Sequence, residues 1–156
     1  MRGRGLAWLL MVACSNQRPA DGQVLLYVDT DSPLPPPPGE TLAEDEPFPL
    51  FDTLLVEVFR PGDDAPCPAC SRYFALDRDM FARRKASFGI PAETGVSGYR
   101  VRLRLFDSRA TLTGTLPEPR PDGGPSQSVV EYTAALPVVD DVGVVERSVL
   151  LETGSV

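Results

Sequence analysis

The 156-residue sequence contains no histidine, and this absence removes several kinds of chemistry. Without an imidazole, the chain cannot build a Ser–His–Asp triad, a histidine-ligated zinc site or a histidine general base from its own residues. Lysine is almost as scarce, since Lys85 is the single lysine among 15 basic residues. The net charge is −7, and because an acidic surface repels phosphate backbones, we expect no nucleic-acid partner.

The apolar run near the amino terminus, Leu6–Ala13, is too short to cross a bilayer, which takes about 20 apolar residues. Two arginines precede this run, and the small residue Ala13 stands directly before Cys14. A basic start, a short apolar stretch and a small residue, in that order, are typical of a secretory signal peptide. We therefore predict that residues 1–13 direct the chain to export and are then removed.

The residues Met11–Cys14 (MVAC) resemble the lipobox of bacterial lipoproteins, with methionine in the place where leucine is usual. The resemblance implies that Cys14 becomes the acylated first residue of the mature protein and that membrane lipid is a partner. Two or more acyl chains hold a protein stably at a membrane. Ser15 follows the cysteine, where an aspartate would imply retention at the inner membrane. The expected location is therefore the cell envelope, at the outer membrane.

Residues after the cysteine divide into a tether and a domain. Positions 14–22 are mostly polar, with proline and glycine, and are expected to form a flexible lipidated tether. Residues 23–152 are expected to form one β-rich domain. The 17 prolines and 13 glycines favour short strands and many turns over long helices. The proline-rich stretches 32–39 and 116–126 are predicted to be surface loops.

Alternating apolar and polar residues predict about seven short strands. The clearest is 99–106, in which three arginines alternate with apolar residues, so one face is expected in the core and the other in water. This arginine row could bind an anion, but we expect it to pair with acids on neighbouring strands. Asp77 is expected to cap one short helix. The predicted strands are residues 23–29, 53–60, 71–76, 86–90, 99–106, 128–136 and 142–151.

These elements predict an all-β fold, an antiparallel β-sandwich with long Pro/Gly-rich loops. The strand 23–29 is apolar on both faces, which indicates a central position. The turn residues around 140–143 are expected to join the last two strands as a hairpin. In its pattern of strands the chain resembles immunoglobulin-like and prealbumin-like modules of secreted proteins. The only tryptophan, Trp8, lies in the predicted signal peptide, so the Cys–Trp–Cys spacing of true immunoglobulin domains is absent.

Cys67 and Cys70 allow three interpretations. An oxidising envelope favours a disulfide that closes a tight turn between two strands. A redox-active pair would need the first thiol at the start of a helix, where its pKa is lowered. A zinc site would need two more ligands, and the sequence offers no further cysteine pair. We expect the disulfide.

Aspartates in two predicted turns are a further candidate site, because carboxylates at one end of a sandwich could hold calcium. The residues concerned are Asp29, Asp31, Asp63 and Asp64. Aspartate is also common in turns because it bonds its own backbone, and the spacing fits no calcium loop.

The sequence therefore predicts a non-catalytic envelope lipoprotein whose β-sandwich is an interaction or scaffold module. No cofactor or metal is expected, and the partner is an unknown protein or carbohydrate. Two alternatives remain open at this point. The domain could be the accessory amino-terminal part of a larger exported enzyme, or a thiol–disulfide protein that uses Cys67 and Cys70.

Overall fold

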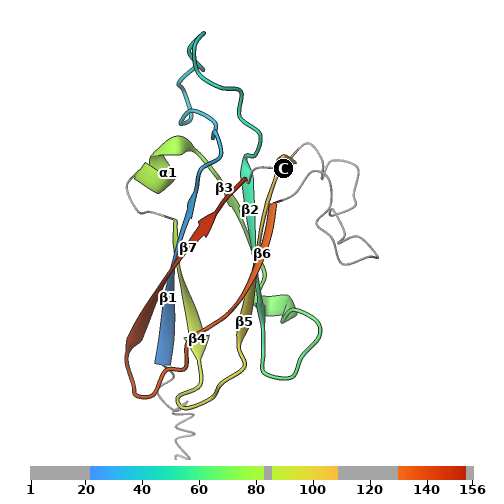
Figure 1. The fold of residues 1–156 in the computed structure, drawn as a ribbon, viewed down its shortest axis with the longest axis vertical. Coiled ribbons are helices and arrows are strands. Elements are labelled where there is room, and N and C mark those ends of the chain that lie inside the picture. Colours follow the sequence, from blue (N-terminus) through green and yellow to red (C-terminus); the bar gives the residue numbers. More distant parts are fainter. Residues whose placement is uncertain (1–21, 83–85, 109–129, 154–156) are drawn as a thin grey trace, which may run out of the picture.

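The fold is a β-sandwich, as the sequence predicts (Figure 1). The structure is a computed structural model that describes residues 22–82, 86–108 and 130–153. The predicted signal peptide, Cys14 and the loop 116–126 lie outside these residues. No helix among the described residues is long and apolar enough to cross a membrane. The described strands are β1 (Gly22–Thr30), β2 (Thr53–Phe59), β3 (Arg72–Ala75), β4 (Ser87–Ala92), β5 (Arg100–Phe106), β6 (Val130–Ala135) and β7 (Val144–Leu151).

Two short helices interrupt the strands. The 3₁₀ helix η1 (Pro68–Cys70) precedes β3, and α1 (Arg78–Ala82) follows it. The side chain of Asp77 accepts a hydrogen bond from the Met80 amide at 3.0 Å, which confirms the predicted cap of α1. The proline-rich loop 32–39 contains neither helix nor strand, because its prolines cannot donate to either.

The strands form a three-stranded sheet in the order β4-β1-β7 and a four-stranded sheet in the order β3-β2-β5-β6. β1 is central, as its two apolar faces indicate. The strand pairs are antiparallel except β1 and β7, which run parallel. The predicted hairpin between the last two strands is wrong, since β6 and β7 lie in different sheets. Leu136 and Val139 of the connecting segment are buried, and this anchors the crossing in the core.

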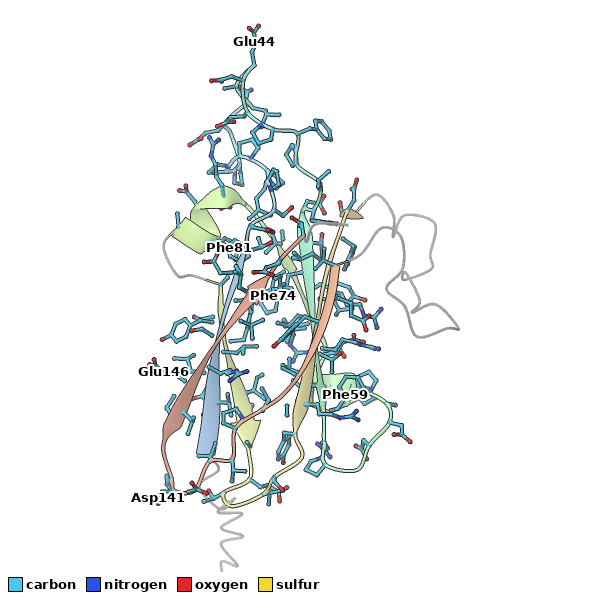
Figure 2. The ribbon with its side chains drawn as sticks, viewed as in Figure 1. Glu44, Phe59, Phe74, Phe81, Asp141 and Glu146 are labelled. Carbon is cyan, nitrogen blue, oxygen red and sulfur yellow. A yellow bond between two sulfur atoms is a disulfide. The ribbon has the colours of Figure 1, made fainter. Side chains whose placement is uncertain are left out.

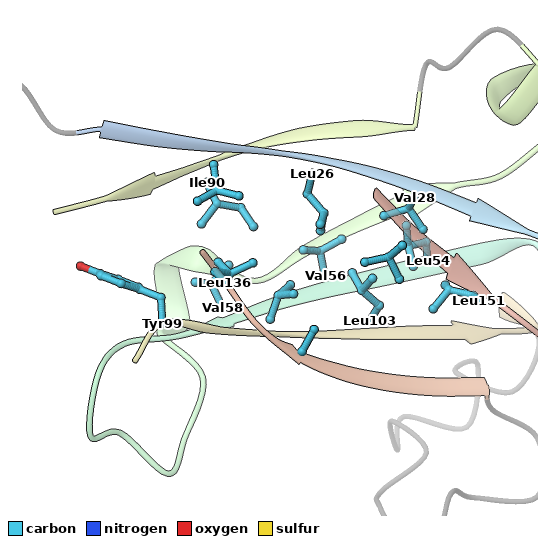
Figure 3. Close-up of a cluster of buried hydrophobic side chains, with 14 of the residues drawn as sticks. Leu26, Val28, Leu54, Val56, Val58, Ile90, Tyr99, Leu103, Leu136 and Leu151 are labelled. Atoms are coloured by element: carbon cyan, nitrogen blue, oxygen red, sulfur yellow. The ribbon is translucent and has the colours of Figure 1, made fainter. Parts of the chain in front are cut away.

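The core lies between the inner faces of the two sheets (Figure 3). Each strand contributes alternate residues to it, because successive side chains of a strand point to opposite faces. Burying one such aliphatic side chain contributes roughly 1.5–3 kcal/mol. The residues that β1, β2 and β5 contribute are Val24, Leu26, Val28, Leu54, Val56, Val58, Val101, Leu103 and Leu105.

The two sheets do not cover each other completely along the side formed by β3 and β4. β3 has four residues and pairs only with Thr53–Val56 of β2. Beyond Val56 the edge of β2 faces η1 instead of a strand, and the Cys67 amide donates to the Val58 carbonyl oxygen at 2.9 Å. The short β3 therefore leaves the sandwich open beside β4.

Candidate functional site

A groove of 710 Å³ occupies this open side of the sandwich, and we call it the β3–β4 groove. Its volume falls within the range of roughly 300–1,000 Å³ that is usual for ligand sites. Apolar side chains of both sheets line the floor, and charged side chains stand at the rim. The lining residues are Val56, Val58, Arg60, Ala69, Cys70, Arg72, Phe74, Ser87, Phe88, Gly89, Ile90, Pro91, Ala92, Glu93 and Tyr99.

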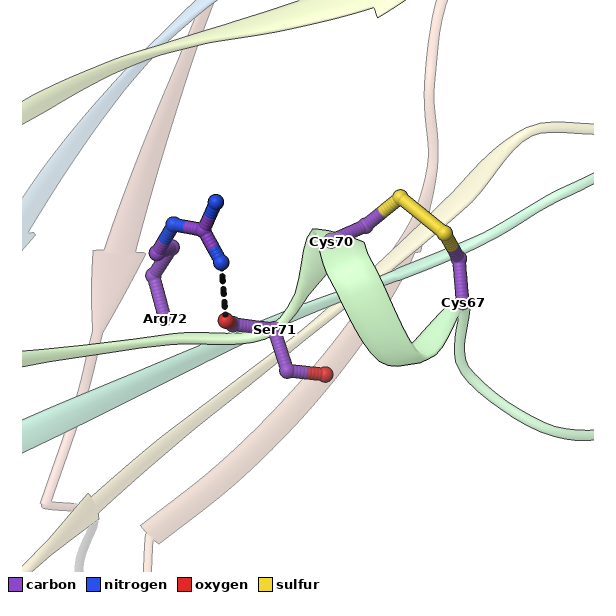
Figure 4. Close-up of a disulfide and its surroundings, with 4 residues drawn as sticks. All are labelled: Cys67, Cys70, Ser71 and Arg72. Carbon is purple, nitrogen blue, oxygen red and sulfur yellow. Dashed lines mark hydrogen bonds between the residues drawn. A yellow bond between two sulfur atoms is a disulfide. The ribbon is translucent and has the colours of Figure 1, made fainter.

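Arg72 belongs to the inner face of the four-stranded sheet, because it lies directly opposite Val56 in the pairing of β3 with β2. It is the first residue of β3, so its side chain stands at the end of the strand instead of inside the core. One guanidinium nitrogen, Nη1, donates to the Ser71 carbonyl oxygen at 2.9 Å (Figure 4). Arg60, the residue directly after β2, also lines the groove and is exposed. Two cationic groups therefore flank an apolar floor.

The opposite wall is the edge of β4. Val28 of β1 donates its amide to the Ala86 carbonyl oxygen at 3.0 Å, so the backbone of Ala86 faces β1. Residues of an antiparallel strand alternate between bonding one neighbour and facing away. Ser87, Gly89 and Pro91 therefore direct their backbone groups away from β1, and all three line the groove. Pro91 has no amide hydrogen, which leaves Ser87 and Gly89 as the outward donors.

Aromatic side chains limit the groove along its length. The rings of Phe74 on β3 and Phe88 on β4 have centroids 4.3 Å apart and join the two sheets at one end. Figure 2 shows Phe74 between the sheets. Tyr99, directly before β5, is buried among the core residues and lines the other end. The groove is therefore a bounded site, open along its side.

The predicted disulfide between Cys67 and Cys70 is present and forms part of the groove wall (Figure 4). It spans η1, where the Cys70 amide donates to the Cys67 carbonyl oxygen at 2.9 Å. The redox interpretation needs a helix that starts at the first thiol, and here one 3₁₀ turn leads directly into β3. The described residues contain no group of three or more cysteine, aspartate or glutamate side chains able to hold a metal ion.

The calcium hypothesis is wrong for Asp29, Asp31, Asp63 and Asp64 as one cluster. Asp31 follows β1 and accepts hydrogen bonds from the amide and hydroxyl of Thr153, at 2.7 and 2.8 Å. Both bonds hold its pKa below the ordinary value, the amide bond having the larger effect. Asp63 follows β2 and offers its backbone oxygen to Arg100, at the opposite end of the sandwich (Figure 1).

The arginines of β5 lie on the outer face of the four-stranded sheet, and the prediction that acids on neighbouring strands pair with them is confirmed for two of the three. Arg102 donates to Glu57 at 2.7 and 3.0 Å. Arg104 forms ion pairs with Glu57 at 2.9 Å and with Glu131 at 3.4 Å. Arg100 instead donates to a backbone oxygen. The prediction that this face lies in water is wrong at Arg104, which is buried.

Aromatic side chains lie at both ends of the arginine row. The guanidinium groups of Arg100 and Arg102 lie 5.1 and 5.2 Å from the centre of the Phe59 ring. At the other end of the face, Tyr73 meets the ring of Phe106 edge to face. Burial, and next the charge of Glu57, raise the pKa of the Tyr73 phenol. The arginine row therefore stabilises the sheet.

Sequence reasoning did not find Arg60, Arg72 or the edge of β4. One signal for the edge was available, because a proline inside a strand indicates an edge position, and Pro91 lies in β4. The location of Arg72 depends on the register of β3, which the sequence pattern does not define.

No protein-family model matches the chain, and neither the curated proteins nor the solved structures that were searched contain a match. What the groove binds must therefore be inferred from its own residues.

Proposed function

We propose that this protein is a lipid-anchored binding module of the bacterial cell envelope, which holds a ligand in the β3–β4 groove and performs no catalysis. The observation that carries the proposal is the groove itself, an apolar floor flanked by Arg60 and Arg72 on the open side of the sandwich. The resemblance of Met11–Cys14 to a lipobox supports the anchor.

The course of the chain supports a defined orientation on the membrane. Residues 14–21 would span at most roughly 25–29 Å when fully extended, so an acylated Cys14 keeps Gly22 close to the bilayer. The end of the sandwich where β1 begins, marked by Asp141 in Figure 2, then faces the membrane. The loop that carries Glu44 points away from it. The groove opens at the side, between these two ends.

Charge keeps this end of the domain off the bilayer surface. Several acidic residues gather at the end of the sandwich where β1 begins, and anionic lipid headgroups repel them. A domain repelled by the bilayer stands off from it, so the groove remains accessible to a ligand. These acids are Asp63, Asp64, Glu93, Asp140 and Asp141.

Mass spectrometry of the mature protein tests the anchor. We expect a first residue at Cys14 with the mass of two or three acyl chains, and partition into detergent. In Cys14→Ser the acyl mass should disappear and the protein should leave the membrane fraction. The matched control is Cys70→Ser, the same replacement at a cysteine of the disulfide, which should remain acylated. A soluble protein that still begins at Met1 would overturn the proposal.

A further inference from the structure

We propose that the β3–β4 groove binds an extended peptide segment as an added strand on β4, and that a carboxylate of the peptide pairs with Arg60 and Arg72. This inference rests on the proposed binding function and adds the chemical class of the ligand. Three properties of the groove, its backbone edge, its floor and its charge, each limit what can bind there.

The backbone edge favours a strand. Ser87 and Gly89 present amide and carbonyl groups to the groove, and Pro91 presents a carbonyl group. Within the described residues these groups bond no other strand, since β4 pairs only with β1. An extended peptide satisfies such groups by extending the sheet. A strand of six residues, the length of β4, is about 20 Å long, so a short peptide segment is sufficient.

The lack of a side chain at Gly89 keeps this edge compact. Gly89 lies opposite Leu25 of β1, and the side chain of Gln23 occupies the space that a Cβ on Gly89 would enter. Gly89 itself therefore adds no side chain at the centre of β4, and the side chain of Gln23 covers that position on the outer face of the sheet.

The floor and the charges determine which side chains the peptide must carry. Side chains that point between the sheets meet Val58, Ile90 and Cys70, so apolar residues are favoured there. Arg60 and Arg72 stand at the same wall, with Glu93 as the single acidic lining residue. Charge complementarity therefore selects a carboxylate. The expected inward row of the peptide is apolar, acidic, apolar, at every second position.

Calorimetric titration of the mature full-length protein in detergent tests this directly. The probe is a seven-residue peptide with blocked ends and the sequence Thr-Val-Thr-Glu-Thr-Val-Thr, so that valine, glutamate and valine occupy every second position. We expect saturable binding, and loss of binding when lysine replaces the glutamate. Arg72→Glu should weaken binding about tenfold or more, because a charge-assisted hydrogen bond is replaced by repulsion. The matched control is Arg147→Glu, an exposed position on β7 at the opposite edge of the three-stranded sheet, which makes the same charge change and should bind normally.

Backbone methylation of the probe separates strand addition from other modes. Amide groups of alternate residues point to opposite sides of a strand. One version of the probe carries methyl groups on the amides of its odd positions, and a second version carries them on the even positions. We therefore expect one version to lose binding and the other to bind like the intact probe. Amide resonances of Ser87 and Gly89 should shift with the intact probe.

Several results would overturn the inference. The glutamate peptide could fail to bind, or the lysine peptide could bind as tightly as the glutamate peptide. The two methylation patterns could have equal effects, or Arg147→Glu could weaken binding as much as Arg72→Glu. Displacement of the peptide by oleate, with the same dependence on Arg72, would assign the groove to a lipid instead. If the peptide fails while Cys14 carries acyl chains, strand addition is rejected and the anchor is retained.

Discussion

Glu57 and Arg104 form an ion pair on the outer face of the four-stranded sheet, with an Oε2–Nη2 distance of 2.9 Å and only 8% and 6% of their side chains exposed. They lie on the neighbouring strands β2 and β5, and Arg104 is two residues along β5 from Arg102, which is directly opposite Glu57. Arg102 shares the same carboxylate. An ionised side chain with so little solvent exposure depends on its partner, because removing one residue of the pair leaves the other desolvated and unpaired.

We predict that Glu57→Ala lowers the free energy of unfolding by about 3 kcal/mol, the cost of an uncompensated buried charge. Urea denaturation measures this loss. Glu131→Ala removes a second acid partner of Arg104 at a more exposed position and should cost about 1 kcal/mol. Equal losses in the two variants would show that Glu57 is not the centre of the network.

Gly22 and Gly143 provide a second, matched pair of variants. A Cβ on Gly22 would lie 2.9 Å from the Cβ of buried Val139, whereas a Cβ on Gly143 would meet nothing within 4 Å. Gly22→Ala should therefore destabilise the protein by about 1–3 kcal/mol through overpacking, and Gly143→Ala should not. Thermal unfolding of both variants checks the difference. A wild-type melting temperature for Gly22→Ala would mean that the segment around Val139 shifts to accommodate the added methyl group without loss of stability.

Asp31 makes stability depend on pH in the acid range. The Thr153 amide and hydroxyl lower its pKa in the folded protein below the ordinary value of 3.8. The contribution of these bonds is therefore complete above that value and is lost as the pH falls through the lower folded pKa. Asp31→Asn should show a lower melting temperature than the wild type near pH 7, and the difference should shrink toward about pH 2. A constant difference across this range would contradict the assignment.

The disulfide should contribute little to stability, because it closes a very short loop. Replacing both Cys67 and Cys70 by serine should lower the free energy of unfolding by about 2 kcal/mol or less. Denaturation with and without reductant measures this, and the double variant should not respond to reductant. Insulin reduction by the wild-type protein, lost in Cys67→Ser, would instead favour the thiol–disulfide alternative.

Much of the fold could be predicted from local patterns. The alternation in 99–106 identified β5, and the apolar faces of 23–29 placed β1 at the centre of its sheet. Sheet membership could not be predicted in the same way. β7 pairs in parallel with β1, more than 100 residues away in sequence, and that choice depends on how the two layers pack.

The candidate site was less predictable than the fold. The disulfide was predicted from the oxidising compartment that we expected, but the groove results from the shortness of β3 and the register that leaves Arg72 on its inner face. Likewise, a period of two identified the arginine row but not the burial of Arg104, which depends on acids from β2 and β6.

The parallel pairing of β1 and β7 has a mechanical consequence. β1 begins where β7 begins, and both end at the opposite end of the sandwich. Tension between Gly22 and Leu151 would therefore pull the two strands past each other along their length. Their hydrogen bonds would carry the load together, whereas a hairpin pulled open from its ends loses its bonds one after another. A domain tethered through β1 and pulled through β7 is thus suited to bear force without unravelling.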